Sequence, residues 1–325
     1  MARVLLIFSN RSDFTVDYVI CRLIELGLPY FRINSEEIST SQYNLNYDRT
    51  GHSQLLRICE RELLIEDVRC VWYRRKPTPD IPPSIMPVDR LFAFSELSHI
   101  VEGLFPNSNV RWVDHPSSVW MAERKLQQLR AAVDLGVPIP RTIISTELHK
   151  LQKFVKTHPN GVICKPIFRG INFINGEAES AYTRIVRIEE LEQLAEERTF
   201  PTLLQELIPK GKDLRITVVG DKFYGVEIIT SKKIVDWRVP EAKPKYSRYD
   251  VPEVLKIYCK KILSHFGLTY GAFDFAVDPG GDSYFLEVNA VGEWAWLDRE
   301  LNLGIREALI NFFYGIKNDD YRFPS

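Results

Sequence analysis

The sequence of this 325-residue chain predicts an α/β fold built from more than one domain. An apolar run at Val4–Phe8 is followed by apolar residues at helical spacing from Asp17 to Leu26, and a second strand pattern lies at Tyr30–Ile33. This β-α-β order is typical of parallel sheets. Near the end of the chain, Tyr270–Asn289 has the pattern of two strands joined by a turn. Strands and helices therefore alternate along the whole length.

The next elements follow from the same patterns. Leu55–Ile58 and Glu62–Ile65 flank a short connection and predict a hairpin. Val71–Arg75 predicts a strand that ends in paired arginines. A helix is expected from Asp89 to Leu104, and its apolar stripe comprises Leu91, Phe94, Leu97 and Val101. Val110–Val113 predicts one more strand before a proline that suits a helix start.

The middle of the chain continues the alternation. One helix is expected through Trp120, Lys125 and Leu129 until Gly136 stops it. Gly161–Lys165 predicts a strand with a lysine at its end, whereas Phe168–Ser180 lacks periodicity and predicts a loop. Two further strands are expected at Leu203–Ile208 and at Asp213–Val218, the second buried on one side only.

These elements divide into three expected domains. Residues 1–115 form an amino-terminal α/β domain, residues 116–200 a central domain, and residues 201–325 a carboxy-terminal domain that carries the hairpin.

Composition excludes several classes of protein. The formal net charge of -1 leaves no broad basic excess, so nucleic acid is not an expected partner. The five cysteines are scattered and lack Cys-x-x-Cys spacing, which favours a reduced, cytoplasmic setting. No apolar segment is long enough for a membrane span, and the amino terminus lacks the regions of a signal peptide.

The final hairpin gathers oxygen ligands. If Pro279–Asp282 form the turn, Ala276 lies opposite Phe285 and Asp274 lies opposite Glu287, with Asn289 two residues further on the same face. Like charges across a strand pair are destabilising, and a bound cation reverses that effect. Two carboxylates and an amide oxygen suit Mg²⁺ together with substrate phosphates. The alternative is a solvated acidic face.

Residues suited to a nucleoside triphosphate precede the hairpin. Lys125 and Lys165 are candidates for the phosphates, and the strand end Gln205–Ile208 is a candidate edge for a purine base. Asp213 and Arg215 follow on the next strand. No phosphate-binding loop of the Gly-x-x-x-x-Gly-Lys-Ser/Thr type exists, and no Gly-x-Gly-x-x-Gly follows the first strand. A surface lysine is the ordinary alternative for each lysine taken alone.

The order and spacing of these residues, from Lys125 to Asn289, resemble the ATP-grasp superfamily. Within it the chain is most similar to the graspetide synthetases, the microviridin-type peptide macrocyclases. The phrases that carry this likeness are Val71-Trp-Tyr-Arg-Arg75, Asp213-Leu-Arg-Ile-Thr-Val-Val-Gly220, Asp236-Trp-Arg238, Tyr270-Gly-Ala-Phe-Asp274 and Glu287-Val-Asn-Ala-Val-Gly-Glu293. One departure is that the loop after Lys165 carries only Gly170 and Gly176, so a glycine-rich lid is not evident.

The resemblance implies an ATP- and Mg²⁺-dependent ligase that acts on a ribosomal precursor peptide with a leader and an acidic core. An Asp or Glu side chain of the core would be phosphorylated and then joined to Ser, Thr or Lys as an ester or amide. Arg215 and Arg238 are implied as catalytic, and Arg74, Arg75, Trp237 and Glu293 as substrate-binding. A homodimer is also implied by the family resemblance.

Other interpretations stay open from the sequence alone. A surface ion pair is the alternative for Arg238, and packing is favoured for Trp294 and Trp296. A rival function in the same chemistry is a ligase that joins a free amino acid or small amine to a carboxylate. A rival from another class is a peptide-binding protein that kept the fold without turnover.

Overall fold

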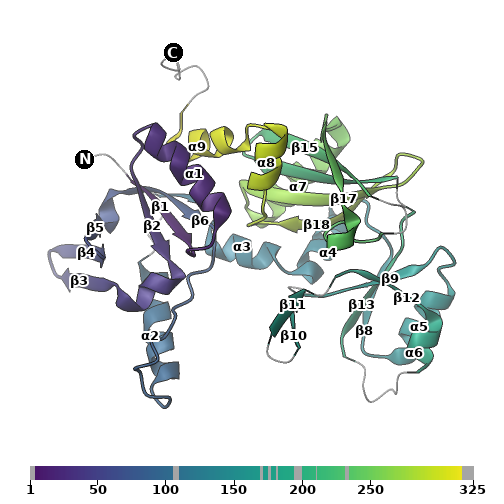
Figure 1. Cartoon of the computed structure of the whole chain (residues 1–325), viewed down its shortest axis with the longest axis horizontal. Helices are drawn as coiled ribbons and strands as arrows, with labels where there is room; N and C mark the ends of the chain where they lie inside the picture. The colour runs from purple at the N-terminus through teal and green to yellow at the C-terminus, as the bar shows by residue number, and fades with distance from the viewer. Residues whose placement is uncertain are drawn as a thin grey trace.

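A computed structural model of the chain describes residues 4–104, 110–168, 182–193, 200–209, 211–230 and 234–316, together with the backbone of 171–174 and 177–180. Three bodies are distinct in Figure 1: an amino-terminal domain, a central domain and a carboxy-terminal sheet with its helices. Among the described residues, no helix is both long enough and apolar enough to cross a membrane.

The amino-terminal domain is built on the predicted β-α-β unit, which the structure confirms. Its parallel sheet has the order β2-β1-β6-β7, formed by Tyr30–Asn34, Val4–Ser9, Val68–Tyr73 and Arg111–Val113. Helix α1 (Phe14–Glu25) begins after Asp13, whose side chain accepts a hydrogen bond from the Val16 amide. Alternate residues of β1 point to opposite faces, so Leu5 and Ile7 enter one apolar core and Leu6 and Phe8 enter another.

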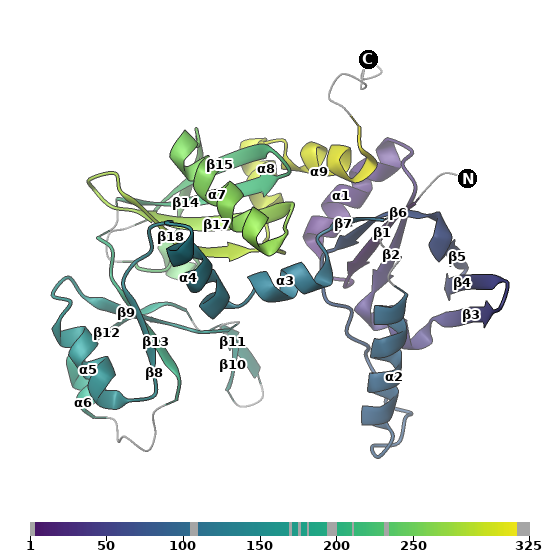
Figure 2. The same cartoon turned by 180° about the vertical axis from the view of Figure 1, so that it is seen from behind.

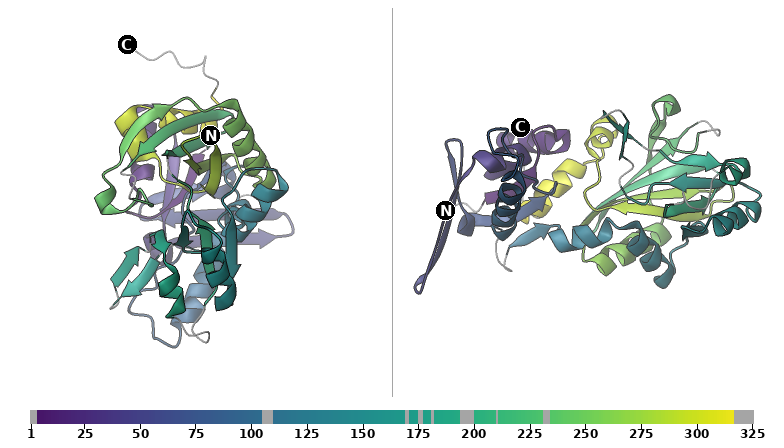
Figure 3. Two further views of the ribbon diagram at one scale, coloured as in Figure 1. Left: turned by 90° about the vertical axis from the view of Figure 1, so that its right-hand side faces the viewer. Right: turned by 90° about the horizontal axis from the view of Figure 1, so that it is seen from below.

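A three-stranded antiparallel sheet projects from this domain. It comprises β3 (Gln42–Asp48), β4 (Gly51–Ile58) and β5 (Arg61–Leu64), and the β4–β5 pair confirms the predicted hairpin. Short 3₁₀ turns precede and follow this sheet along the chain, at η1 (Ser35–Thr40) and η2 (Ile65–Asp67). A further 3₁₀ turn, η4 (Pro240–Ala242), lies in the carboxy-terminal part of the chain. The right-hand view of Figure 3 shows how far β3 and β4 extend.

Helix α2 (Arg90–Gly103) is present, but the predicted buried stripe is wrong in its first half. Val101 is buried, whereas Leu91 is 76% exposed and Phe94 38% exposed. Figure 2 shows the reason, since the amino-terminal part of α2 extends beyond the sheet that its other end covers.

The single helix expected between residues 116 and 136 is two helices. They are α3 (Pro116–Ala122) and α4 (Lys125–Asp134), and the chain turns between them at Glu123 and Arg124. Both helices contact α7, and α4 also contacts β18, so they pack on the carboxy-terminal sheet. Lys125 consequently lies at the start of a helix.

The central domain is an antiparallel sheet of order β12-β9-β13-β8, formed by Arg184–Val186, Val162–Lys165, Thr202–Glu206 and Thr142–Ser145. Helices α5 (Leu148–Lys156) and α6 (Ile188–Glu192) cover its apolar core. Because β13 pairs with β8 and β9, this sheet extends past the boundary expected at residue 200.

The loop predicted for 168–180 is instead partly a hairpin. Strands β10 (Ile171–Ile174) and β11 (Glu177–Ser180) pair in antiparallel register. The Asn-Gly dipeptide between them in the sequence is a strong hairpin signal that the periodicity argument overlooked. Gly170 and Gly176, on which the expectation about a lid rested, lie outside the described residues.

The carboxy-terminal sheet is antiparallel and has the order β16-β15-β14-β17-β18. Its strands are Lys245–Tyr249, Lys222–Ile229, Lys212–Val219, Tyr270–Val277 and Ser283–Asn289. Helix α7 (Glu253–Phe266) packs its apolar side on the sheet. Helices α8 (Ala295–Leu301) and α9 (Ile305–Tyr314) follow, and α9 contacts both β14 and β6, so it joins this sheet to the amino-terminal domain (Figure 1).

Strand β14 differs from expectation because both of its faces are buried. Leu214, Ile216 and Val218 enter the apolar core, and Asp213, Arg215 and Thr217 on the opposite face are also buried. Its position between β15 and β17 places it in the interior of the sheet, where a polar face requires polar partners. The buried side chain of Arg215 therefore needs polar partners within the protein.

Candidate active site

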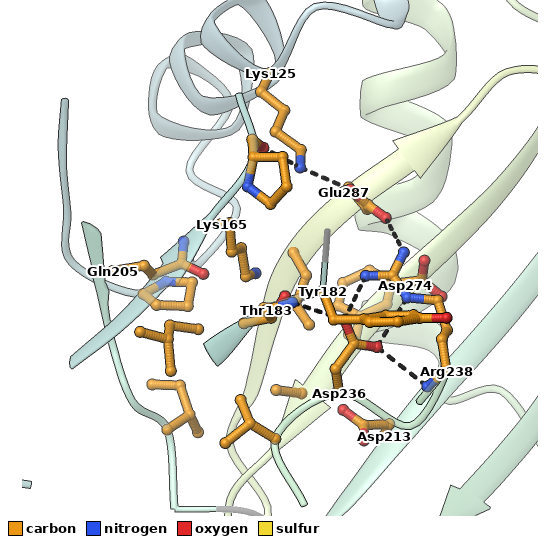
Figure 4. Close-up of a pocket in the computed structure, with 18 of the residues that line it drawn as sticks. Lys125, Lys165, Tyr182, Thr183, Gln205, Asp213, Asp236, Arg238, Asp274 and Glu287 are labelled. Carbon is orange, nitrogen blue, oxygen red and sulfur yellow. Dashed lines mark hydrogen bonds and ion pairs between the residues drawn. The ribbon is translucent and has the colours of Figure 1, made fainter. Parts of the chain in front are cut away.

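A cavity of about 350 Å³ lies between the central sheet and the carboxy-terminal sheet (Figure 4). All ten residues predicted for nucleotide and metal binding line it: Lys125, Lys165, Gln205, Glu206, Leu207, Ile208, Asp213, Asp274, Glu287 and Asn289. Trp237 and Arg238 line it as well. Residues that are separated by more than 160 positions in the chain are thus brought to one cavity.

The hairpin pairs Asp274 with Glu287, as predicted, but by a different route. Near the turn, Ala276 lies opposite Tyr284 and not opposite Phe285, because Asp278 and Asp282 are hydrogen-bonded and the turn is one residue shorter than expected. A bulge between positions 274 and 275 then restores the register. Two deviations of one residue therefore cancel at the carboxylates.

Asp274 is held by a buried guanidinium. Arg215 Nη1 donates to both carboxylate oxygens of Asp274, at 3.0 and 2.8 Å, and Asn289 Nδ2 lies 3.4 Å from one of them. Burial raises the pKa of Asp274, and the nearby charge of Glu287 adds to this effect while Arg215 opposes it. Arg215 does not line the cavity itself and reaches its edge through Asp274.

Glu287 lies between two cations. Lys125 Nζ is 3.5 Å from one carboxylate oxygen and Arg238 Nη1 is 3.7 Å from the other, and the two approach from opposite sides in Figure 4. Burial acts to raise the pKa of Glu287, but Lys125, Arg238 and Lys165 outweigh it and lower the pKa below its usual range. Glu287 is therefore an anion beside the less readily ionised Asp274.

This donor set fits a magnesium ion. Two carboxylates and one amide group, all at the cavity wall, are hard oxygen donors. No cluster of three or more His, Cys, Asp or Glu side chains suited to a metal exists among the described residues. Such a site would leave coordination positions for phosphate oxygens and water, which is how Mg²⁺ is usually bound with a nucleotide.

The opposite wall offers partners for a nucleotide. Lys125, at the start of α4, also donates to the Pro166 carbonyl at 2.8 Å, and Lys165 ends β9 beside it. Gln205 is buried and donates to Thr142, but its Oε1 accepts no hydrogen bond from the described residues. A buried acceptor at a cavity wall without a partner fits a ligand that carries an N–H group, such as a purine amine.

Arg238 is held in a fork by Asp236. Its Nε and Nη2 donate to the two oxygens of the Asp236 carboxylate, both at 2.9 Å, and the Arg238 backbone amide donates to it at 3.1 Å. The amide of Thr183, from the central domain, is a further donor at 3.1 Å. Burial works to raise the pKa of Asp236, yet Arg238 and these amides lower it to about 2.

The aromatic residues around the site have separate environments. Trp237 packs against Trp296 and Tyr246, with ring centroids 6.0 and 6.5 Å away. Trp294 is 1% exposed and belongs to the core beneath α1 and α9, in agreement with the packing interpretation.

Arg74, Arg75 and Glu293 do not line the cavity. Arg74 is buried, and its guanidinium donates to the carbonyls of Val291 and Gly292. Arg75 is half-exposed and pairs with Asp13 and with Glu293. The structure thus brings these predicted substrate-binding residues together with each other at the contact between the amino- and carboxy-terminal domains.

Sequence reasoning missed two residues that shape the site. Gln128 is buried one turn after Lys125, donates to the Val288 carbonyl at 2.9 Å and accepts from the Val288 amide at 2.9 Å, so it fixes α4 beside Glu287. Thr183 reaches Asp236 from the other domain. An isolated glutamine and a backbone amide leave no pattern in a sequence.

Comparison with known proteins shows which proteins this chain is similar to. Residues 3–120 match the model of the MvdD pre-ATP grasp domain. The structure superposes on macrocyclase MdnC from Microcystis aeruginosa MRC, bound with its precursor peptide MdnA, with a TM-score of 0.83 and 25% identity over 96% of this chain and 99% of that one. Macrocyclase MdnB from the same organism gives a TM-score of 0.80 and 27% identity, over 96% and 99% of the two chains.

The chain is an ATP-grasp ligase, and it is similar to the graspetide synthetases. Consistent with this fold, the ligase superposes on a RiPP-associated ATP-grasp ligase from Chryseobacterium gregarium in complex with ADP and a leader and core peptide, with a TM-score of 0.85, 24% identity and coverage of 99% and 100%. It is also 24% identical over 221 residues to the α-aminoadipate–LysW ligase LysX of Sulfurisphaera tokodaii, covering 65% of this chain and 74% of LysX. The expected fold class and superfamily are confirmed.

Proposed function

We propose that the ligase closes ester or amide rings within a ribosomal precursor peptide, in the manner of the microviridin-type macrocyclases. The observation that carries the proposal is the convergence of Asp274, Glu287 and Asn289 with Lys125, Lys165 and Arg238 on one cavity. The likeness to macrocyclases MdnC and MdnB over nearly the whole chain supports a peptide as substrate.

The chemistry has two steps. A side-chain carboxylate oxygen of the peptide attacks the γ-phosphorus of ATP, forming an acyl phosphate and releasing ADP. A hydroxyl or amine of the same peptide then attacks the acyl carbon, loses its proton, and expels inorganic phosphate. Activation is needed because a carboxylate repels nucleophiles, and holding both peptide groups in one site lowers the entropic barrier to closure.

The residues of the chain divide these tasks. Asp274, Glu287 and Asn289 would hold Mg²⁺, which when bound offsets phosphate charge. Lys125 and Lys165 neutralise the phosphates, and Gln205, Glu206, Leu207 and Ile208 with Asp213 surround the nucleotide. Arg238, half-exposed at the cavity wall, binds the peptide carboxylate beside Trp237, and Arg215 supports the transferred phosphoryl group from behind Asp274.

Incubation of the ligase with ATP, magnesium and the precursor peptide encoded beside its gene tests this proposal. The expected products are ADP and a peptide lighter by about 18 Da for each ring, one water being formally lost. A peptide that gains the mass of an added amine would instead support the intermolecular ligase. The similarity of this chain to the ligase LysX is the observation that favours this alternative. An unchanged mass without ADP would favour a non-catalytic binding protein.

We further propose that the ligase is a homodimer of the reduced cytoplasm. Exposed apolar side chains gather at the start of α2 and just before it: Met86, Val88, Leu91, Phe92 and Phe94. A monomer rarely leaves such a patch in water, and a second copy would cover it. Leu91→Glu with Phe92→Glu should convert a dimer to a monomer in light scattering, whereas the same change at exposed Tyr47 should not. A monomeric parent protein would contradict this proposal.

A further inference from the structure

The paired arginines at the end of β6 connect the amino-terminal domain to a loop of the carboxy-terminal domain. Arg74 is 2% exposed, and its Nη1 donates to the carbonyl oxygens of Val291 and Gly292, the second at 3.4 Å. These two carbonyls belong to the segment that follows Asn289, the last residue of β18. A buried guanidinium of one domain thus holds the backbone of another.

The same segment holds Arg215 from its other side. The Glu293 carbonyl accepts a hydrogen bond from Arg215 Nη2 at 3.1 Å, and Tyr270 Oη donates to the Gly292 carbonyl at 2.8 Å. A Cβ atom at Gly292 would lie 2.6 Å from Ala272 Cβ and 3.0 Å from Arg215 Nη2. The backbone therefore contacts Arg215 directly, with no room for a side chain between them.

Side chains reinforce this contact. The Glu293 carboxylate pairs with both Arg74 and Arg75, and Thr15 donates to its other oxygen. Asp13, which also caps α1, pairs with Arg75 at 3.0 Å and lies 3.4 Å from Arg74. Two guanidinium groups and two carboxylates balance in charge, and Arg74 and Asp13 are buried, so removal of Arg74 leaves the Asp13 carboxylate with less compensating charge in a buried position.

We propose that Arg74 is a positioning residue through which the amino-terminal domain fixes Arg215, and with it Asp274, at the catalytic cavity. The path is short: Arg74 holds the carbonyls of Val291 and Gly292, the next carbonyl holds Arg215, and Arg215 holds Asp274. The inference rests on the proposed function, in which Arg215 and Asp274 serve phosphoryl transfer. A displacement of about 1 Å at such a site can lower the rate by about 10²-fold.

Three variants test the proposal. Arg74→Ala removes the contact, Arg74→Lys keeps a donor and the charge, and Arg32→Ala is the matched control. Arg32 is a partly buried arginine of the same domain whose described hydrogen bonds go to Asp17 and Asn10, within that domain. We expect Arg74→Ala to lower kcat for precursor-dependent ADP formation by about 10- to 100-fold, with precursor affinity changed by less than about twofold. Arg74→Lys should recover part of the loss.

Hydrogen exchange supplies a readout that needs no substrate. Amides of 289–294 should exchange faster in Arg74→Ala, and to a smaller extent in Arg74→Lys, while those of Arg32→Ala should match the parent. If Arg74→Ala does not fold, the proposal is tested by comparing Arg74→Lys with Arg32→Ala, both in the hydrogen exchange of 289–294 and in kcat. Unchanged exchange, or a kcat loss no larger than that of Arg32→Ala, would overturn the proposal.

A third result has its own meaning. Weaker precursor binding at an unchanged kcat would overturn the positioning role and assign Arg74 to substrate binding. If the parent ligase forms no ADP with its precursor, the proposed function fails, and the exchange of 289–294 still decides whether Arg74 orders this segment.

Discussion

Asp274 and Glu287 lie directly opposite each other across β17 and β18, yet their pKa values shift in opposite directions. Burial dominates at Asp274, where Arg215 and Arg238 offset only part of the rise in pKa, whereas Lys125, Arg238 and Lys165 together lower the pKa of Glu287. The pair therefore combines one carboxyl group that ionises more readily than usual with one that ionises less readily than usual. This difference suits a site that completes itself by binding a cation.

Glu287→Gln should abolish turnover while leaving the fold intact. The amide keeps the shape of the side chain but removes the charge that faces Lys125 and Arg238, so we expect kcat to fall by at least about 10²-fold. ADP release from ATP, magnesium and precursor measures the effect. Thermal unfolding serves as its control, because a Tm well below that of the parent would show that structure, and not chemistry, was lost.

Asp236→Asn should destabilise the protein in a pH-dependent manner. The pKa of Asp236 lies at about 2, below its ordinary value of 3.8, so its ionised form stabilises the fold above about pH 4 and this contribution is lost as the pH falls towards 2. The shift corresponds to about 2 kcal/mol. Urea unfolding of parent and variant should differ by about that amount at pH 7, with the gap closing below pH 4. A gap independent of pH would contradict the assignment.

Gly292→Ala tests the close approach of the backbone to Arg215. The added methyl group would lie 2.6 Å from Ala272 Cβ, so the segment or β17 must shift. We expect a loss of about 1–3 kcal/mol in stability and a fall in kcat larger than that loss explains. Gly281→Ala, at a turn where a Cβ meets nothing within 4 Å but φ is +97°, controls for backbone strain alone.

Gln128→Leu should disturb the site from the cavity wall, at the side of α4. The substitution leaves the amide and carbonyl of Val288 without their partner in a buried position, at a cost of about 1–3 kcal/mol. Because α4 carries Lys125, nucleotide affinity should fall as well, and titration calorimetry with an ATP analogue measures it. Equal nucleotide affinity in parent and variant would show that Gln128 supports the fold only.

The sequence predicts the juxtaposition of those candidate site residues that lie in short motifs. Asp274, Glu287 and Asn289 were placed together from strand alternation alone, although the turn and the bulge each differed from expectation by one residue. Lys125 and Gln205 were found through their order along the chain. Strand alternation brings these three candidate ligands together because the two shifts of one residue compensate each other.

Contacts between domains could not be predicted in this way. Arg74 and Glu293 were expected to bind substrate, but nothing local tells a buried guanidinium that holds a backbone carbonyl from one that faces a cavity. The hydroxyl of Thr15 and the amide of Thr183 likewise meet partners far along the chain, 278 and 53 positions away. Such partners follow from tertiary packing, which no single segment encodes.

The most direct test of the account follows an oxygen atom. A precursor peptide whose Asp and Glu side chains carry ¹⁸O is incubated with the ligase, ATP and magnesium, and the released inorganic phosphate is analysed by mass spectrometry. If a side-chain carboxylate becomes an acyl phosphate, one labelled oxygen passes to phosphate for each ring closed. Unlabelled phosphate alongside a closed ring would contradict the account.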